Sequence, residues 1–243
     1  MVLPAYAIDD IRRKADELAA GYLGASGNVG LAIGVLVDNQ RLYFGYGTTA
    51  KGSDRVPDEH TVFEIGSVTK VFTAILMEEM AGRGEVQVDQ PVRELLPPGT
   101  AVPKRGDREV TLMDLSTHTA GFPMMPGNWQ EAVKDEANPY ADYTPDHLYK
   151  ALAKTRLRWR PGSRDDYSNY GVGLLGHALE LRAGQPYESL LIERVLRPLG
   201  MNDTVIALSD EHKKRMAAGH DEDGQPTANW DIRTLGGAGA LQS

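Results

Sequence analysis

Residues 63–77 read FEIGSVTKVFTAILM, and this stretch decides most of what the sequence predicts. Ser67 is followed three residues later by Lys70, and an apolar run begins immediately after the lysine. We expect a buried helix over residues 68–80, because the residues after Lys70 are apolar almost all round. Side chains three positions apart on a helix lie on one face, so the serine hydroxyl and the lysine ammonium are predicted to be neighbours.

This spacing is typical of a nucleophile paired with its own base. A serine hydroxyl is a weak nucleophile until a neighbour takes its proton, and a lysine does so only where burial or positive charge lowers its pKa. The N-terminus of a helix also favours an oxyanion beside the serine. The alternative is a serine N-cap followed by a solvated lysine. Only Ser67 among the serines has lysine three residues later, and a surface lysine is less expected on a buried helix.

A second pair of polar residues, Tyr167 and Asn169, follows the turn signal at Pro161-Gly162. We expect both on a loop just before a helix over residues 171–181. A phenol can relay protons with a lysine that depresses its pKa, and an amide can hold both a lysine and a substrate amide. The alternative is a buried tyrosine beside an asparagine helix cap.

Together these residues resemble the class C β-lactamase group of penicillin-recognising serine enzymes. That group includes β-lactamases, D-Ala-D-Ala carboxypeptidases, D-aminopeptidases and family VIII carboxylesterases. The resemblance covers nearly the whole chain: FEIGS at 63–67, DLSTHTAGFP at 114–123, RPLGMNDT at 197–204 and GAGALQS at 237–243 are each similar to a segment of the family.

The resemblance implies a role for each of the four residues. Ser67 is expected to be the acylated nucleophile, and its backbone N–H half of the oxyanion hole. Lys70 is expected to accept its proton, Tyr167 to assist proton transfer and Asn169 to hold substrate. The substrate is expected to be a small ester, amide or β-lactam, hydrolysed as by a carboxylesterase or a D-Ala-D-Ala peptidase.

One motif of the family is missing. No Lys-Ser/Thr-Gly or His-x-Gly occurs, and the chain stops at Ser243, where the family continues with the central strands of its sheet. We therefore expect an incomplete enzyme, completed by a C-terminal segment or a second chain. Two classes of function stay open: a serine hydrolase, or a non-catalytic ligand-binding or interaction module on the same fold, such as an inactive fragment.

The architecture implied is α+β, with a helix-flanked antiparallel sheet, an all-helical lobe and the active site between them. We expect one domain over 1–243, incomplete at its C-terminus: an N-terminal helix over 8–23 and a hairpin of 29–37 with 41–46 within 1–60, a mainly helical lobe over 61–230, and a return to the α/β lobe over 231–243. The lobe's other helices are predicted at 110–115, 145–153 and 187–196.

Composition narrows the partners. A net charge of −8 argues against nucleic acid and anionic membranes, and no apolar stretch is long enough to span a bilayer. The start MVLPAY lacks a basic region followed by an apolar run, which favours the cytoplasm unless a leader was removed. Without cysteine there is neither a disulfide nor a thiol nucleophile.

Three other sequence features are not assigned to catalysis or ligand binding. Residues 171–176 read GVGLLG, but the stretch follows a loop rather than a strand, so close helix packing is favoured over nucleotide binding. His118 is predicted to be a buried, hydrogen-bonded structural histidine. The histidines lack metal-ligand spacing, so we expect no metal and no cofactor.

Overall fold

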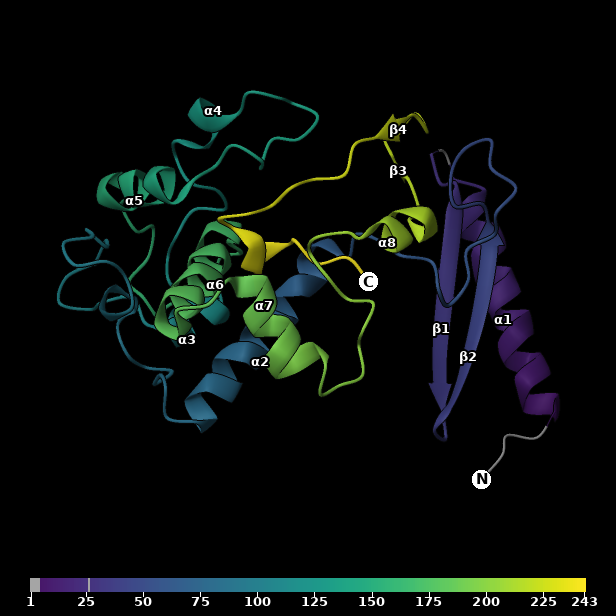
Figure 1. The fold of residues 1–243 in the computed structure, drawn as a ribbon, viewed down its shortest axis with the longest axis horizontal. Coiled ribbons are helices and arrows are strands. Elements are labelled where there is room, and N and C mark those ends of the chain that lie inside the picture. The colour runs from purple at the N-terminus through teal and green to yellow at the C-terminus, as the bar shows by residue number, and fades with distance from the viewer. Residues whose placement is uncertain (1–4, 26) are drawn as a thin grey trace. The chain divides into compact units, whose positions relative to one another are not determined.

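The structure, a computed structural model, describes residues 5–25 and 27–243, and these residues cluster into two compact units (Figure 1). The first unit takes in the described residues up to 63 together with 208–229. The second comprises residues 64–207 and 230–243. The described residues contain helices and two small antiparallel sheets of two strands each, which confirms the predicted α+β class. Residues 1–4, on which the expected compartment partly rests, lie outside the described residues.

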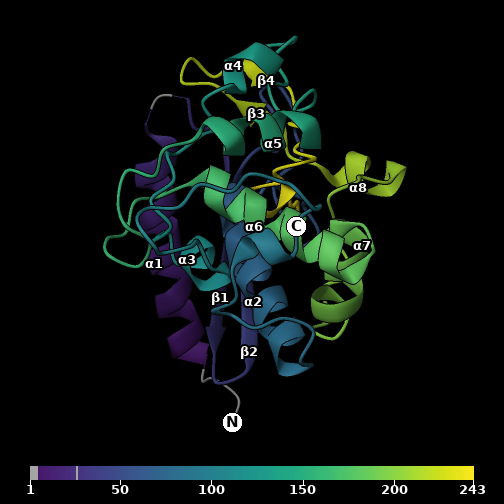
Figure 2. The ribbon, with the colours of Figure 1, turned by 90° about the vertical axis from the view of Figure 1, so that its left-hand side faces the viewer.

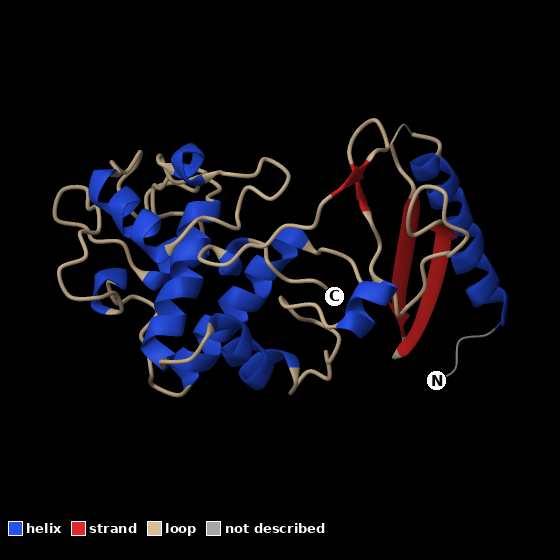
Figure 3. Ribbon diagram, turned by 45° about the horizontal axis from the view of Figure 1, so that its top comes forward, coloured by secondary structure: helices blue, strands red, loops and turns tan. Residues whose placement is uncertain are grey.

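In the first unit a long helix packs against a hairpin (Figure 3). Helix α1 (Ala5–Leu23) contacts both β1 (Gly30–Val37) and β2 (Gln40–Gly47). The Tyr46 hydroxyl donates a hydrogen bond of 2.7 Å to the Asp16 carboxylate, which ties the second strand to the helix. A lone two-stranded hairpin is marginal in water, so this helix gives the strands an apolar surface to cover.

The hairpin turn is shorter than the sequence analysis expected. Val37 pairs with Gln40, so the turn consists of Asp38 and Asn39 alone, both with positive φ (47° and 64°). Two-residue turns with positive φ at both positions match the right-handed twist of the strands, and Asp and Asn tolerate that conformation. The antiparallel hairpin is confirmed, whereas Gln40 begins the second strand instead of ending the turn.

Residues 208–229, which the sequence analysis placed in the helical lobe, cluster with the first unit. They contain helix α8 (Asp210–Arg215) and the short strands β3 (Gly219–His220) and β4 (Pro226–Thr227). Backbone hydrogen bonds join them to Val62, whose N–H donates to Arg215 and whose carbonyl accepts from Ala217. Two-residue strands carry no periodic signal, so their sequence did not predict them.

The second unit is mainly helical, and α2 and α6 lie in contact within it (Figures 1 and 2). Among the described residues, no helix combines the length and apolar character needed to cross a bilayer. The α-helices of this unit are α2 (Thr69–Gly82), α3 (Leu112–Ser116), α4 (Trp129–Ala132), α5 (Pro145–Lys154), α6 (Asn169–Ala183) and α7 (Tyr187–Leu191). The 3-10 turns are η1 (Gly66–Val68), η2 (Val92–Glu94) and η4 (Gly236–Ala238), and α7 continues as the π-helix η3 (Ile192–Leu196).

The glycines of α6 allow η4 to lie directly against this helix. A Cβ atom at Gly173 would come within 3.0 Å of the Leu235 Cα atom, and one at Gly176 within 3.0 Å of the Gly237 Cα atom. Helix α6 is buried along most of its length, so a side chain larger than that of glycine would find no open space at either position. The structural explanation of the GVGLLG stretch is therefore correct in kind, although its partner is a 3-10 turn.

Helix α2 is buried on one side only, which corrects the expectation of a helix buried all round. Phe72, Leu76 and Met80, spaced four residues apart, face the core of the second unit. On another face Val71 is 56% exposed and Ile75 41% exposed. An apolar sequence without a polar face does not specify which side meets the core, so only the fold decides it.

Candidate active site

Ser67 lies at the surface of the second unit, in the 3-10 turn that leads into α2. The turn begins at Gly66, whose positive φ of 49° suits a residue without a Cβ atom. Lys70 occupies the first turn of α2 and is half-buried. Its Nζ atom donates a hydrogen bond of 3.0 Å to Ser67 Oγ. The structure thus brings the predicted nucleophile and base into direct contact.

Tyr167, two residues before α6 begins, completes the cluster. Its hydroxyl lies 2.6 Å from Ser67 Oγ, and its ring centroid lies 4.8 Å from Lys70 Nζ. Serine, lysine and tyrosine therefore share one hydrogen-bonded cluster, and Ser67 and Tyr167 are both exposed residues. A hydrogen-bonded set of this kind can pass a proton from the serine without moving any backbone.

The local electrostatics suit Tyr167 to proton transfer. Burial raises the pKa of its phenol, but hydrogen bonding to Lys70 and Ser67, together with the positive charge of Lys70, outweighs burial. The pKa of Tyr167 consequently lies below its usual value of 10.0. A lower pKa makes the phenolate more accessible near neutral pH, which a group that accepts a serine proton needs.

The segment carrying Tyr167 is fixed by its neighbour Ser168, which caps α6. Ser168 Oγ accepts a hydrogen bond of 2.9 Å from the Gly171 N–H and donates one of 2.7 Å to the Pro123 carbonyl. The helix starts at Asn169, two residues earlier than predicted, and the cap is serine rather than asparagine. The order of polar residues alone did not distinguish these two capping residues.

His118 supports the same segment as a structural residue. Its Nδ1 atom accepts a hydrogen bond of 3.1 Å from the Ser168 N–H, and its ring centroid lies 4.6 Å from that of Tyr167. The side chain is half-buried rather than buried. Burial, and after it the positive charge of Lys70, lowers the pKa of His118, which favours the neutral ring that this contact requires.

Asn169 lies beside the serine but makes a different set of contacts from those expected. Its Nδ2 atom is 3.8 Å from Met125 Sδ, and among the described residues its buried Oδ1 atom has no hydrogen-bond partner. In the described contacts Lys70 bonds to Ser67 and to a backbone carbonyl instead of to this amide. Asn169 shares the lining of one pocket with Ser67, and a rotation of its side chain would bring this buried oxygen to a ligand there.

The backbone acceptor of Lys70 is the carbonyl of Ala238 in η4, at 2.6 Å. Sequence reasoning did not find it, because every residue carries a carbonyl and only the fold selects one. The available signal was the GAGALQS stretch itself, whose small residues allow η4 to approach α2 and α6.

A pocket of about 130 Å³ opens beside Ser67. Its lining includes Asn169, the glycines at 66 and 239, and the apolar side chains of Tyr140, Trp230, Ile232 and Leu235. Among the described residues, no charged side chain lines this pocket. The sequence analysis did not identify this wall, since its two aromatic residues are ninety positions apart.

Hydrogen bonds hold the aromatic wall together. Asn138 and Asp231 exchange two of them, at 2.8 and 3.1 Å, and the Thr234 hydroxyl donates to the Tyr143 carbonyl at 2.6 Å. These contacts join segments 138–143 and 230–234, so the rings of Tyr140 and Trp230 lie 5.2 Å apart by their centroids. The wall is therefore a fixed apolar surface rather than a loose loop.

The site combines a serine hydroxyl, a lysine ammonium, a phenol and an apolar pocket. Among residues 5–25 and 27–243, no group of three or more metal-ligating side chains is placed to hold an ion. The chemistry that these residues can perform is transfer of an acyl group to a serine hydroxyl. Their individual catalytic roles stay predictions.

Comparison with known proteins gives consistent matches over almost the whole chain. A family model described as Beta-lactamase matches residues 15–242. The D-alanyl-D-alanine-carboxypeptidase/endopeptidase AmpH of Escherichia coli (strain K12) is 32% identical over 240 residues, which cover 99% of this chain and 60% of that protein. A Beta-lactamase of Pseudomonas fluorescens is 32% identical over 219 residues, which cover 89% of this chain and 57% of that protein.

Solved structures match at the level of the fold. The D-alanine Carboxypeptidase AmpC from Burkholderia cenocepacia has a TM-score of 0.81 at 27% identity, over 97% of this chain and 61% of that one. A Beta-lactamase/D-alanine Carboxypeptidase from Yersinia pestis has a TM-score of 0.80 at 28% identity, over 93% and 64%. This chain thus spans about 60% of the length of the curated relatives it matches.

Proposed function

Because this chain belongs to the β-lactamase family and has its β-lactamase/transpeptidase-like fold, we propose that it is a serine hydrolase that forms an acyl-enzyme through Ser67. The observation that carries the proposal is the contact of Ser67 Oγ with both Lys70 Nζ (3.0 Å) and the Tyr167 hydroxyl (2.6 Å). An N-cap serine with a solvated lysine, the alternative, would have no reason to hold a second proton-transfer group at hydrogen-bond distance.

The proposed reaction begins with acylation of Ser67. Ser67 Oγ attacks the substrate carbonyl carbon and its proton passes to Lys70 or Tyr167, whichever is deprotonated. The carbonyl oxygen becomes an oxyanion beside the Ser67 N–H and the start of α2, where positive potential stabilises it. When the carbonyl re-forms, the C–N or C–O bond to the leaving group breaks, and that group takes the proton. Water then attacks the ester, assisted by the same two side chains, and releases Ser67.

The substrate class proposed is an ester, an amide or a β-lactam with an uncharged acyl group. The names of the relatives point to β-lactams and to peptides ending in D-alanine. The pocket beside Ser67 is lined by Tyr140, Trp230 and two aliphatic side chains, and a charged acyl group would lose hydration there without gaining a partner. Asn169 lines the same pocket, and after a rotation of its side chain the unpaired amide oxygen suits an N–H donor on the substrate.

We also propose that a further segment, in the same polypeptide or as a second chain, completes the site. Two observations support it. The chain spans about 60% of the length of its relatives. Exposed apolar side chains follow one another at Val68, the last residue of η1, and at Val71 and Ile75 on α2, so that they form one stripe.

The completing segment can be tested by comparing residues 1–243 alone with the same residues plus the segment. We expect the short form to melt at a lower temperature or to hydrolyse esters poorly, since losing one oxyanion-hole donor alone costs about 10²–10³-fold in turnover. Thermal melts and hydrolysis of a short-chain p-nitrophenyl ester and nitrocefin give the answer. A sharp melt with full turnover by residues 1–243 would overturn this part of the proposal.

The acyl-enzyme itself can be tested by labelling. The protein, with any completing segment, is incubated with a fluorophosphonate or a labelled penicillin, and the adduct is mapped by mass spectrometry. We expect label at Ser67, none in Ser67→Ala, and normal labelling in Ser163→Ala, a matched change at an exposed serine outside the site. Labelling of another serine, or undiminished labelling of Ser67→Ala, contradicts the assignment. The cytoplasmic location favoured by the sequence stays a prediction.

A further inference from the structure

The carbonyl that holds Lys70 belongs to a turn that is itself anchored on α2. Thr73 lies one helical turn after Lys70, and its hydroxyl donates a hydrogen bond of 2.7 Å to the Gly237 carbonyl. The next residue is Ala238, whose carbonyl accepts from Lys70 Nζ at 2.6 Å. Two successive carbonyls of η4 thus bond to side chains on one face of α2.

A buried tyrosine stands behind Thr73. The Tyr187 hydroxyl, from α7, lies 2.7 Å from Thr73 Oγ1. A threonine hydroxyl has a single hydrogen, and the carbonyls of Gly237 and Thr69 (3.3 Å) can only accept it. Thr73 therefore accepts from Tyr187, and the hydrogen bonds run in one direction, from Tyr187 through Thr73 to Gly237. Burial raises the pKa of Tyr187 and keeps its phenol a donor.

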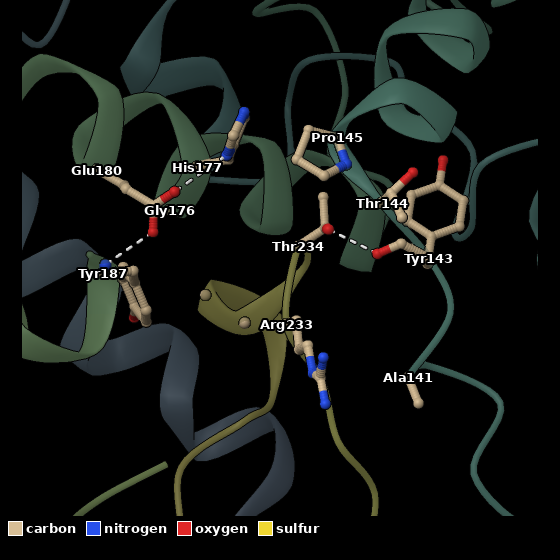
Figure 4. A pocket seen from close by; sticks show the side chains of 12 residues that line it. Ala141, Tyr143, Thr144, Pro145, Gly176, His177, Glu180, Tyr187, Arg233 and Thr234 are labelled. Atoms are coloured by element: carbon tan, nitrogen blue, oxygen red, sulfur yellow. Dashed lines mark hydrogen bonds and ion pairs between the residues drawn. The ribbon is translucent and has the colours of Figure 1, made fainter. Parts of the chain in front are cut away.

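The backbone of Tyr187 is also fixed, by a hydrogen bond to α6. Its backbone N–H donates to the Glu180 carboxylate at 2.8 Å, and Glu180 also contacts His177 at 3.5 Å (Figure 4). Tyr187 and Gly237 border a pocket of about 310 Å³, which shares no lining residue with the pocket beside Ser67. The hydroxyl of Tyr187 makes no contact with Ser67 or Tyr167 among the described contacts, so any effect on the reaction passes through Thr73 and η4.

We propose that Thr73 and Tyr187 are positioning residues for the acylation step, which hold the Gly237–Ala238 backbone where it aims Lys70 at Ser67. The proposal rests on the function proposed above. If Thr73 loses its hydroxyl, the Gly237 carbonyl loses its donor and the buried phenol of Tyr187 loses its acceptor. The turn can then shift, and Lys70 loses the acceptor that fixes its Nζ atom 3.0 Å from Ser67 Oγ. A misplacement of about 1 Å in a reacting group can cost about 10²-fold in rate.

Two changes at one position provide the test. Thr73→Val keeps the shape but removes the hydroxyl, whereas Thr73→Ser keeps the hydroxyl and removes only the methyl group. We expect Thr73→Val to slow the acylation of Ser67 about 10- to 100-fold with little change in KM, and Thr73→Ser to recover most of the rate. The rate is measured as the time course of label on Ser67 by intact mass spectrometry.

A second pair of variants separates positioning from general loss of stability. Tyr187→Phe removes the hydroxyl behind Thr73, whereas Tyr170→Phe removes another buried phenol hydroxyl, which lies 3.3 Å from the Thr155 hydroxyl. We expect the first to slow acylation and the second not to, even if both lower the melting temperature. If Thr73→Val fails to fold, this pair decides the matter.

The outcomes are distinguishable from failure of the proposed function. Unlabelled wild-type protein refutes the acyl-enzyme itself. Labelled wild type with an equally fast folded Thr73→Val, or with Tyr187→Phe no slower than Tyr170→Phe, overturns the positioning role alone.

Discussion

A methyl group added at Gly173 is predicted to destabilise the second unit, although it is added to a helix. In Gly173→Ala the new Cβ atom would lie 2.6 Å from Leu235 Cδ2, 2.9 Å from its Cβ and 3.0 Å from its Cα. The nearest atom is the end of a side chain that can rotate, but the other two move only with the backbone. Leu235 precedes η4, so its displacement also moves the turn that holds Lys70.

The magnitude follows from two opposing terms. Overpacking a well-filled core by one methyl costs about 1–3 kcal/mol. Replacing glycine by alanine in a helix raises the free energy of unfolding by about 1 kcal/mol. Gly82→Ala, at the end of α2, has nothing within 4 Å of its Cβ and gains only the second term. The two variants should therefore differ by about 1–3 kcal/mol, which corresponds to a difference of roughly 2–12 °C in melting temperature.

The measurement is a thermal melt by circular dichroism of wild type, Gly173→Ala and Gly82→Ala under identical conditions. Gly82→Ala should melt at or above wild type and Gly173→Ala at least a few degrees below Gly82→Ala. The rate of Ser67 labelling should fall in Gly173→Ala alone. If Gly173→Ala melts as high as Gly82→Ala, the close approach of η4 to α6 is refuted as the reason for these glycines.

Three other changes test the site. Lys70→Arg should lose about 10²–10⁴-fold in acylation rate while Lys150→Arg on α5 loses nothing, because a guanidinium keeps its proton at working pH; near-normal turnover would make Lys70 a structural residue. His118→Asn should flatten the pH dependence of the melting temperature, and asparagine tolerates the positive φ at this position. The pKa of His118 is lowered in the folded state, so wild-type stability falls as pH drops below about 6.5. A variant with the same slope of melting temperature against pH would exclude His118 as the cause. Trp230→Ala should reduce the preference for apolar over charged acyl groups by about 10-fold in kcat/KM. An unchanged preference would show that the aromatic wall does not select the acyl group.

Local patterns predicted the contact between Ser67 and Lys70 that the structure shows. The Ser-x-x-Lys spacing placed the two side chains on neighbouring turns, because that relation depends only on helical geometry within four residues. The hairpin and most of the helices were predicted for the same reason, with errors of a few residues at their ends. The turn at Asp38–Asn39 shows the limit: the sequence indicates a turn there, but the strand pairing decides that it takes two residues.

Longer relations needed the tertiary structure. Tyr167 lies a hundred positions from Ser67, and its approach depended on resemblance until the fold placed the two hydroxyls 2.6 Å apart. The lysine's acceptor, the Ala238 carbonyl, carries no side-chain signal at all. The wall formed by Tyr140 and Trp230 also needed the fold, because hydrogen bonds between two segments far apart in the sequence bring the two rings together.

The sequence by itself determined the chemistry, namely a serine, a lysine and a phenol of types suited to acyl transfer, because chemical identity belongs to single residues. The tertiary structure decided the geometry: which carbonyl aims the lysine, which side of α2 is buried and which rings line the pocket. These depend on contacts between segments far apart in the chain. Their stability comes from packing that no local pattern records.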